Sequence, residues 1–182
     1  KHIQNLVLEN ALIPDGKTRG RSYRLAPLLS WKKKYQINAG VTEDQVWNGD
    51  VAPSLGQLPK NVMDIWHYGF TEMFNNAIDH SEGQTLEVQF EKTAAKTEIV
   101  ITDDGVGIFR KIQAALGLLD ELHSVLELAK GKLTTDPARH SGEGIFFTSR
   151  MFDDYWIMSG GVYFSHEFGK KEDWILEAHK PA

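Results

Sequence analysis

The chain has 182 residues, no Cys and a net charge of −5 at neutral pH. Its length suits one folded domain with a small appendage. A hydrophobic content of 41% with five Trp indicates a packed globule and excludes a disordered chain. The lack of Cys excludes disulfides and thiolate metal sites and is typical of the cytoplasm, where we expect the protein. No apolar run approaches the ~18 residues of a membrane span, so we expect no membrane contact. The sequence opens on Lys1 within a helical pattern, which indicates a piece of a longer protein.

Positive charge is concentrated near the N-terminus. Residues 1–36 carry eight Lys or Arg against two acids, a balance of +6, so the rest of the chain carries −11. Such an asymmetry indicates either a basic nucleic-acid arm on an acidic body or a solvated basic face.

Residues 1–27 predict a helix end followed by a β-hairpin. Apolar residues lie at i, i+3 and i+4 between residues 2 and 10, and two alternating arms flank a Gly-rich turn at 14–20. This order resembles the end of the recognition helix and the wing of a winged-helix DNA-binding domain, although the first two helices of such a domain are absent. The resemblance implies phosphate contacts from four basic side chains of the wing: Lys17, Arg19, Arg21 and Arg24. An ordinary exposed hairpin is the alternative.

We expect the remainder, residues 28–182, to form the main domain. Residues 31–37 predict a strand, and Thr42 followed by acidic residues predicts a helix start. Four residues are then expected to break the chain before the main helix: Gly49, Pro53, Gly56 and Pro59.

The main helix is predicted over residues 60–80. Its apolar positions cluster on one side at 100° per residue. Glu72, Asn76 and Asp79 fall within roughly 60° of one another on the opposite side, so two carboxylates and a carboxamide form one row.

Strands and glycines follow in a pattern that suits nucleotide chemistry. The sequence predicts strands at 85–90 and 97–102, and the second runs into Asp103, Gly105 and Gly107. A helix is expected over 114–129, then a polar stretch over 130–140. Gly142 and Gly144 are expected to open a helix over 145–152, where backbone N–H groups can bind phosphate. Three further strands are expected at 155–159, 162–167 and 174–179.

Three segments together carry a family resemblance: EMFNNAIDH at 72–80, DDGVGI at 103–108 and SGEGI at 141–145. They resemble the N, G1 and G2 boxes of the GHKL ATPases, which include gyrase, Hsp90, MutL, sensor histidine kinases and anti-sigma-factor serine kinases. The resemblance implies an α+β fold, in which helices cover one face of a mixed, mostly antiparallel sheet (the Bergerat fold). It also implies ATP and Mg²⁺ as cofactors and an ATP lid over residues 109–141.

Roles for individual residues also come from the resemblance. Asp103 would accept a hydrogen bond from the adenine amine, Asn76 would hold Mg²⁺, and Glu72 would serve as general base. Guanine has a carbonyl where adenine has that amine, so Asp103 would disfavour it. The other expected nucleotide contacts are Asp79, His80, Gly105, Gly107, Ile108, Gly142, Gly144 and Ile145. Neither a phosphate loop of the G-x-x-x-x-G-K-[ST] type nor a Rossmann fingerprint is present.

The sequence leaves three functions open. The leading one is a regulatory module that binds ATP or ADP, hydrolyses ATP slowly and belongs to a transcription regulator that binds DNA, as a homodimer, in its full-length form. The second is serine phosphorylation of a protein partner, as in the anti-sigma-factor kinases. The third is a non-catalytic scaffold for protein interaction. A sensor histidine kinase is disfavoured because no dimerising helical hairpin with a phosphoacceptor His fits this sequence.

Overall fold

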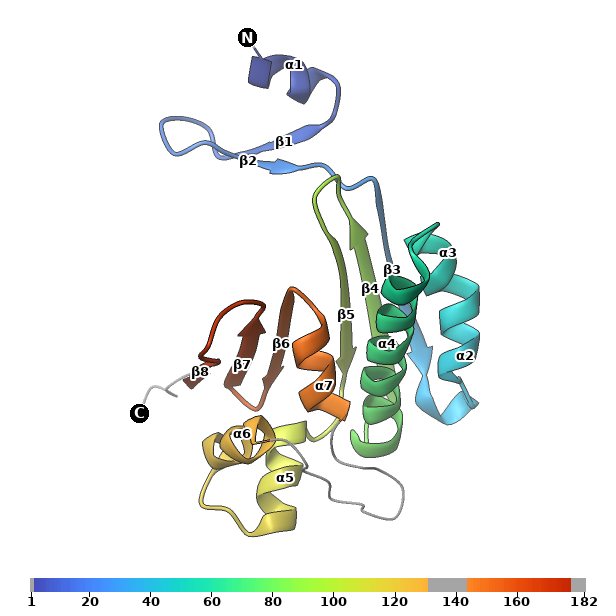
Figure 1. The fold of residues 1–182 in the computed structure, drawn as a ribbon, viewed down its shortest axis with the longest axis vertical. Coiled ribbons are helices and arrows are strands. Elements are labelled where there is room, and N and C mark those ends of the chain that lie inside the picture. Colours follow the sequence, from blue (N-terminus) through green and yellow to red (C-terminus); the bar gives the residue numbers. More distant parts are fainter. Residues whose placement is uncertain (1, 131–143, 178–182) are drawn as a thin grey trace.

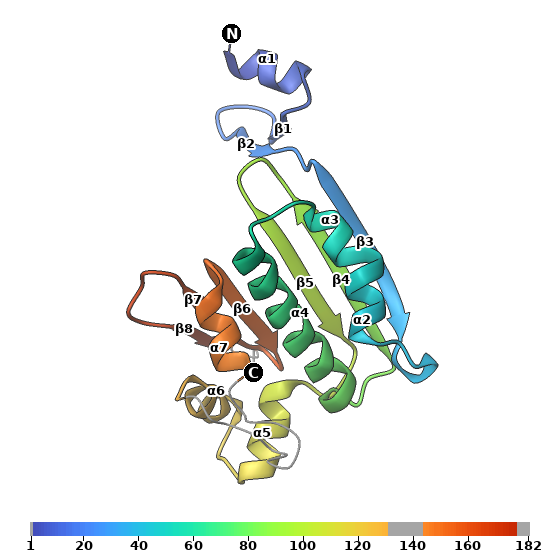
Figure 2. The same cartoon turned by 45° about the vertical axis from the view of Figure 1, so that its right-hand side comes forward.

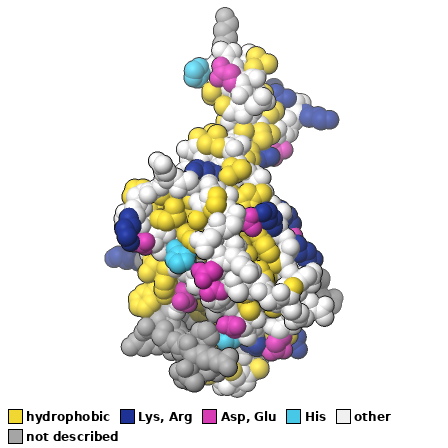
Figure 3. All heavy atoms as spheres, turned by 90° about the vertical axis from the view of Figure 1, so that its right-hand side faces the viewer, with side chains coloured by type: hydrophobic (Ala, Val, Ile, Leu, Met, Phe, Trp, Pro, Cys, Tyr) yellow, Lys and Arg dark blue, Asp and Glu magenta, His cyan; other side chains and the backbone are white. Residues whose placement is uncertain are grey.

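The computed structural model describes residues 2–130 and 144–177. Its N-terminal part is a short helix, α1 (His2–Leu8), and a hairpin of β1 (Leu12–Asp15) and β2 (Ser22–Leu25). The two arms pair antiparallel, which confirms the predicted hairpin. Helix and hairpin form a narrow projection above the body (Figure 1), with Lys and Arg side chains at its surface (Figure 3).

The body contains a first sheet with the strand order β3–β4–β5 and antiparallel neighbours. Its strands are β3 (Leu29–Gln36), β4 (Thr85–Lys92) and β5 (Thr97–Asp103). Alternation along β4 buries Leu86, Val88 and Phe90 against the helices and leaves polar side chains on the opposite face. Trp31, the cross-strand partner of Phe90, stacks on it with the ring centroids 5.5 Å apart.

A second sheet has the order β6–β7–β8, again antiparallel. Its strands are β6 (Asp154–Ser159), β7 (Val162–Glu167) and β8 (Trp174–Glu177), so the three predicted C-terminal strands are present within the described residues. Ser159, at the end of β6, lies against Gly107, just beyond the end of β5. At the other end, the pKa of Lys96 is raised mainly by its hydrogen bond to Glu98, with a smaller contribution from Asp154 at the start of β6. The edge strands β5 and β6 therefore run side by side in the same direction.

The helical layer over the first sheet consists of α4 (Lys60–His80) and a continuous helical run from Glu43 to Leu55 beside it (Figure 2). The run contains α2 (Glu43–Val46), a π-helical turn (Trp47–Val51) and α3 (Ala52–Leu55). Thr42 caps α2 as predicted, because its side chain accepts a hydrogen bond from the Gln45 backbone N–H.

Two expected breaks in this region are wrong. Gly49 lies inside the π-helical turn, and Pro53 is the second residue of α3, so neither residue interrupts the helical run. The helical run ends only at Gly56, whose φ of +73° favours glycine.

The single helix expected over residues 114–129 is also wrong. Two helices occupy this region, α5 (Ile108–Leu116) and α6 (Glu121–Ala129). Gly117 ends α5 in the left-handed conformation with φ +62°. The Asp120 side chain then caps α6 by accepting a hydrogen bond from the His123 backbone N–H at 2.9 Å. Helix α7 (Gly144–Met151) follows the undescribed segment and matches the predicted helix.

Two hydrophobic cores lie on either side of α4. The first joins α2, α3 and α4 to β4 and includes Phe70, Phe74 and Phe90. The second joins α5 and α6 to β6 and β7 and includes Phe109 and Phe164, with Met73 of α4 packed against it. One helix thus contributes to both cores and fixes the position of the two sheets. Within the part of the chain described, no helix combines the length and apolar content needed to cross a bilayer.

Candidate functional site

A large cleft opens between β5 and β6 and is bounded by α4, the loop 103–108 and the start of α7. Its volume is about 1350 Å³. The predicted N box and G1 box both line it, together with the described part of the G2 box. The expected site residues that line it are Glu72, Asn76, His80, Asp103, Gly105, Gly107, Ile108, Gly144 and Ile145.

Helix α4 presents Glu72, Asn76 and His80 to the cleft. Their spacing of four residues places them on one face, one turn apart. Asp79 is exposed and is not among the residues that line the cleft. The polar row that faces the cleft therefore ends on His80 and not on Asp79.

The two aspartates of the loop have different surroundings. Asp104 is held by three hydrogen bonds: Oδ1 accepts from the backbone N–H groups of Gln84 and Thr85 at 2.8 and 2.9 Å, and Oδ2 accepts from the Thr85 hydroxyl at 2.7 Å. These bonds, with those from Thr85 the largest contribution, lower the pKa of Asp104 to about 2. Asp104 therefore ties the end of β5 to the start of β4.

Asp103, by contrast, faces the cleft. Its Oδ1 accepts a hydrogen bond from the Gly105 backbone N–H at 2.9 Å, which shapes the turn. Within the described residues, Oδ2 has no hydrogen-bond partner. Asp103 therefore offers a carboxylate oxygen to a ligand, whereas Asp104 is occupied by the fold.

Two glycines of the cleft, Gly105 and Gly107, lie so close to neighbouring residues that a side chain would not fit there. A Cβ at Gly105 would lie 2.1 Å from the backbone oxygen of Ser81, at the end of α4. The neighbouring Val106 N–H donates to that same oxygen at 2.9 Å, which holds the loop on the helix. A Cβ at Gly107, whose φ is +85°, would lie 2.4 Å from Ser159 Oγ. The loop can therefore pack between α4 and β6 only without side chains at these two positions.

The side chain of Glu72, the expected general base on α4, lies against the first residue of α7. Glu72 Oε2 is 2.0 Å from the place a Cβ of Gly144 would occupy. This position is the N-terminus of α7, where unpaired backbone N–H groups favour negative charge. Gly142 and the last third of the predicted lid, residues 131–141, lie outside the described residues. The rest of that expected lid, residues 109–130, contains α5 and α6, which pack into the second hydrophobic core.

Sequence reasoning missed two cleft residues. Lys111 of α5 lines the cleft and pairs with Glu82, its Nζ lying 2.8 Å from Glu82 Oε1. Ser159 also lines the cleft, and its hydroxyl is buried without a hydrogen-bond partner among the described residues. Lys111 could have been found from its place one turn after the G1 box. Ser159 reaches the cleft only because β6 lies across the cleft from β5, which no local pattern indicates.

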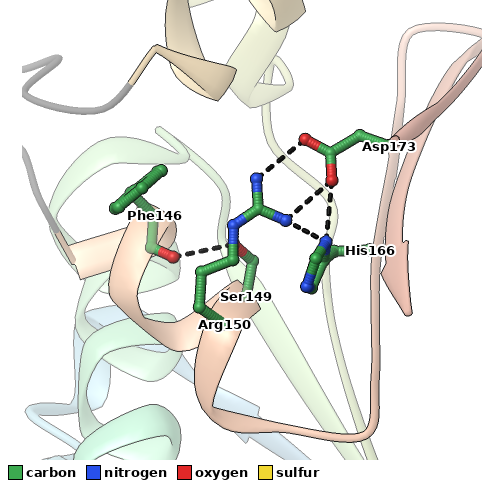
Figure 4. A network of polar contacts seen from close by, with 5 residues as sticks. All are labelled: Phe146, Ser149, Arg150, His166 and Asp173. Carbon is green, nitrogen blue, oxygen red and sulfur yellow. Dashed lines mark hydrogen bonds and ion pairs between the residues drawn. The ribbon is translucent and has the colours of Figure 1, made fainter. Parts of the chain in front are cut away.

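A polar network holds α7 in place against the second sheet (Figure 4). Arg150 of α7 donates two hydrogen bonds to the Asp173 carboxylate, at 2.7 and 2.9 Å. His166 of β7 contacts both partners through Nδ1, at 2.8 Å from Asp173 Oδ1. The bond from Arg150 is the main cause that lowers the Asp173 pKa below its ordinary value. The network fixes the orientation of the helix whose first residue borders the cleft.

The whole arrangement agrees with a comparison with known families. A family model for the histidine kinase-like ATPase domain matches residues 24–162. The chain belongs to this family. Membership implies ATP binding, and the antiparallel sheets under a helical layer confirm the expected α+β fold of such an ATPase domain. No curated protein and no solved structure matches the chain.

The match gives no support to a winged-helix assignment for residues 1–27, because it begins only at residue 24. The four predicted DNA-contacting side chains, Lys17, Arg19, Arg21 and Arg24, are exposed on the hairpin and its turn. Arg21 Nε donates to the Gly16 backbone oxygen at 3.2 Å, across the turn.

Proposed function

We propose that the cleft between β5 and β6 binds Mg-ATP, with the base at Asp103 and the phosphates near the start of α7. The observation that carries this proposal is the contrast between the two loop aspartates. Asp104 accepts three hydrogen bonds within the fold. Asp103 lines the cleft, and its Oδ2 has no hydrogen-bond partner among the residues that the structure describes. An acceptor at this place suits the amine of adenine and disfavours the carbonyl of guanine.

The residues present fit a nucleotide and its metal ion. Gly105 and Gly107 have no side chains that would occupy the cleft. Gly144 is the first residue of a helix whose N-terminus favours phosphate. Asn76 would supply a carboxamide oxygen to Mg²⁺. Mg²⁺ commonly takes one or two ligands from protein and the rest from phosphate and water, and the described residues contain no cluster of three or more His, Asp or Glu that could hold a metal.

Glu72 is the proposed general base. Its carboxylate lies beside Gly144, one turn from Asn76 on the same face of α4, where it could accept a proton from an attacking water or hydroxyl. We infer slow ATP hydrolysis as the reaction of this module. Transfer to a serine of a protein partner uses the same base and is the second candidate.

Calorimetric titration with ATP, with and without Mg²⁺, tests the binding proposal. We expect binding in the micromolar to low-millimolar range, stronger with Mg²⁺ and clearly weaker for GTP. Equal affinity for ATP and GTP would contradict the role of Asp103. Tight binding of Mg²⁺ to the protein alone would contradict the role of Asn76. Phosphate release separates hydrolysis from transfer, because transfer needs an added serine-containing protein.

For the full-length protein we propose a transcription regulator in which residues 1–27 end a winged-helix domain and residues 28–182 form the ATPase domain. Support comes from a helix followed by an exposed basic hairpin that projects from the body (Figure 3). The present chain should bind duplex DNA weakly, without sequence preference and with steep salt dependence. A longer chain with its upstream sequence should bind a specific site as a dimer.

The basic hairpin has its own test in that longer chain. Arg19→Ala should weaken binding equally on all DNA sequences and reduce the salt slope by about one unit. If the longer protein ignores DNA at low salt, the winged-helix proposal is wrong, and a protein-interaction role for the hairpin is supported instead.

A further inference from the structure

The outer faces of the two sheets differ in character. On the first sheet, the face away from the helices carries charged side chains. Two of them, Lys32 and Glu87, form an ion pair at 2.7 Å. On the second sheet, the corresponding face exposes large apolar side chains. Their exposed fractions are 41% for Trp156, 70% for Met158, 62% for Trp174 and 55% for Leu176. A contiguous apolar face of this kind on one sheet alone indicates an interaction surface.

Strand register explains the shape of this face. Trp156, Ser165 and Trp174 are direct cross-strand neighbours on β6, β7 and β8. Neighbouring strands lie about 4.8 Å apart, so the two tryptophans stand roughly 10 Å apart across a small serine. Two aromatic walls with a small residue between them form a trough. The next row along the strands, Met158, Tyr163 and Leu176, continues the apolar surface.

Carboxylates border the trough. Asp154 and Glu167 form the cross-strand pair on the same face, two residues from Trp156 and Ser165. Glu98 of β5 borders it as well, and the groove of about 450 Å³ defined by these residues has no Lys or Arg among the described residues that line it. Nearby lysines do pair with two of the carboxylates, Lys96 with Glu98 at 2.7 Å and Lys170 with Glu167 at 3.8 Å. Exposed pairs of this kind contribute little and exchange partners readily.

We propose that this acidic aromatic trough binds a basic segment of a protein partner, with an Arg or Lys side chain held between Trp156 and Trp174. A cation over an indole ring is attracted by the ring's negative face, and the adjoining carboxylates add charge pairing. Nucleic acid and anionic membranes are disfavoured because their phosphates would face Asp154, Glu167 and Glu98. The trough lies on the outer face of the second sheet. Glu98, Asp154 and Trp156 line both the trough and the nucleotide cleft, whereas Ser165, Glu167 and Trp174 line the trough alone.

A peptide of alternating glycine and arginine is the probe, and the same peptide with glutamate in place of arginine is its control. We expect the arginine peptide to bind, with affinity that falls as salt rises, and the glutamate peptide not to bind. Trp174→Ala should weaken binding about 2- to 30-fold, the range expected for a lost cation–π contact. Glu167→Gln should also lower the affinity for the arginine peptide. Matched controls on other surfaces are Glu9→Gln, which removes one exposed charge from the N-terminal projection, and Leu119→Ala, at a side chain that is 83% exposed.

Several results would overturn the proposal. Equal binding of both peptides would do so, as would unchanged binding by Trp174→Ala or an equal loss of affinity in Glu9→Gln. If sedimentation shows a dimer that Trp174→Ala abolishes, a second copy of this chain occupies the trough and the basic partner is wrong. Far-UV circular dichroism identifies a variant that fails to fold, and Trp174→Leu, which keeps an apolar side chain but removes the indole, then supplies the second measurement. ATP titration of each variant keeps this outcome separate from that of the nucleotide proposal.

Discussion

The Glu72 carboxylate lies directly against Gly144, so that a Cβ on the glycine would fall 2.0 Å from Glu72 Oε2. A helix α4 residue and the first residue of α7 thus share one small space, although they are 72 positions apart in the sequence. Any side chain at position 144 would move the carboxylate away from the helix N-terminus. This relationship makes the position of the proposed base depend on a glycine.

Replacing the base should separate turnover from binding. Glu72→Ala should abolish ATP hydrolysis while leaving ATP affinity nearly unchanged, because the Glu72 carboxylate acts on the reacting atoms and not on the adenine or ribose of ATP. Steady-state phosphate release and calorimetry measure the two quantities. Gly144→Ala should also lower turnover, because its methyl group displaces Glu72. An active Glu72→Ala protein would exclude the proposed role.

Asp103 and Asp104 should respond differently to the same change. Asp103→Asn should weaken ATP binding by about 1–3 kcal/mol and reduce the preference over GTP, since it presents a donor beside the acceptor. Asp104→Asn should instead lower thermal stability, because it disturbs the bonds from Gln84 and Thr85. Nucleotide titration and thermal unfolding of both variants check this. A loss of ATP–GTP discrimination in Asp104→Asn alone would reverse the assignment.

Gly105→Ala should destabilise the domain, since its methyl group would lie 2.1 Å from the Ser81 backbone oxygen and backbone cannot move aside cheaply. Gly20→Ala is the matched control, because nothing lies within 4 Å of a Cβ there and its φ is not positive. Thermal unfolding should show a clear decrease for the first variant and almost none for the second. Equal stability of the two proteins would mean that the loop does not pack on α4 as described.

Acid should weaken the fold through two carboxyl groups. The folded-state pKa of Asp104 is lowered to about 2 and that of Asp173 is lowered as well, so both favour the folded state above their ordinary pKa near 4. Their contribution is lost as the pH falls from about 4 towards 2. Melting temperatures measured over that range should fall steeply in the wild type. Asp104→Asn should flatten part of this decrease, and an unchanged acid profile would contradict it.

How far the sequence predicts this protein can be seen by comparing α4 with the cleft. The period of apolar residues predicted α4 and the strands, and the capping Thr42 predicted the start of α2, because these signals are local. The choice between Asp79 and His80 is not local. From Glu72, 100° per residue puts Asp79 and His80 on opposite sides of Asn76, and only the tertiary packing of α4 decides that His80 lines the cleft.

The break at Gly117 and the role of Ser159 illustrate the same limit. Glycine within an amphipathic pattern is tolerated in many helices, so the pattern over 114–129 did not reveal that Gly117 ends α5. Ser159 enters the cleft because the end of β6 lies against Gly107, which is 52 positions earlier in the sequence. Long-range packing of this kind leaves no periodic signal.

The Arg150–Asp173 pair has a consequence for where the folding unit ends. The segment with recognisable family sequence stops at residue 162, yet the partner of Arg150 lies eleven residues beyond it. A protein cut at that family boundary would lose nearly all of β7 and all of β8, remove Phe164 from the second core and leave a partly buried guanidinium without its carboxylate. The folded unit therefore extends beyond the length that sequence comparison recognises, and we expect a shortened version of this ATPase domain to need the chain through residue 177.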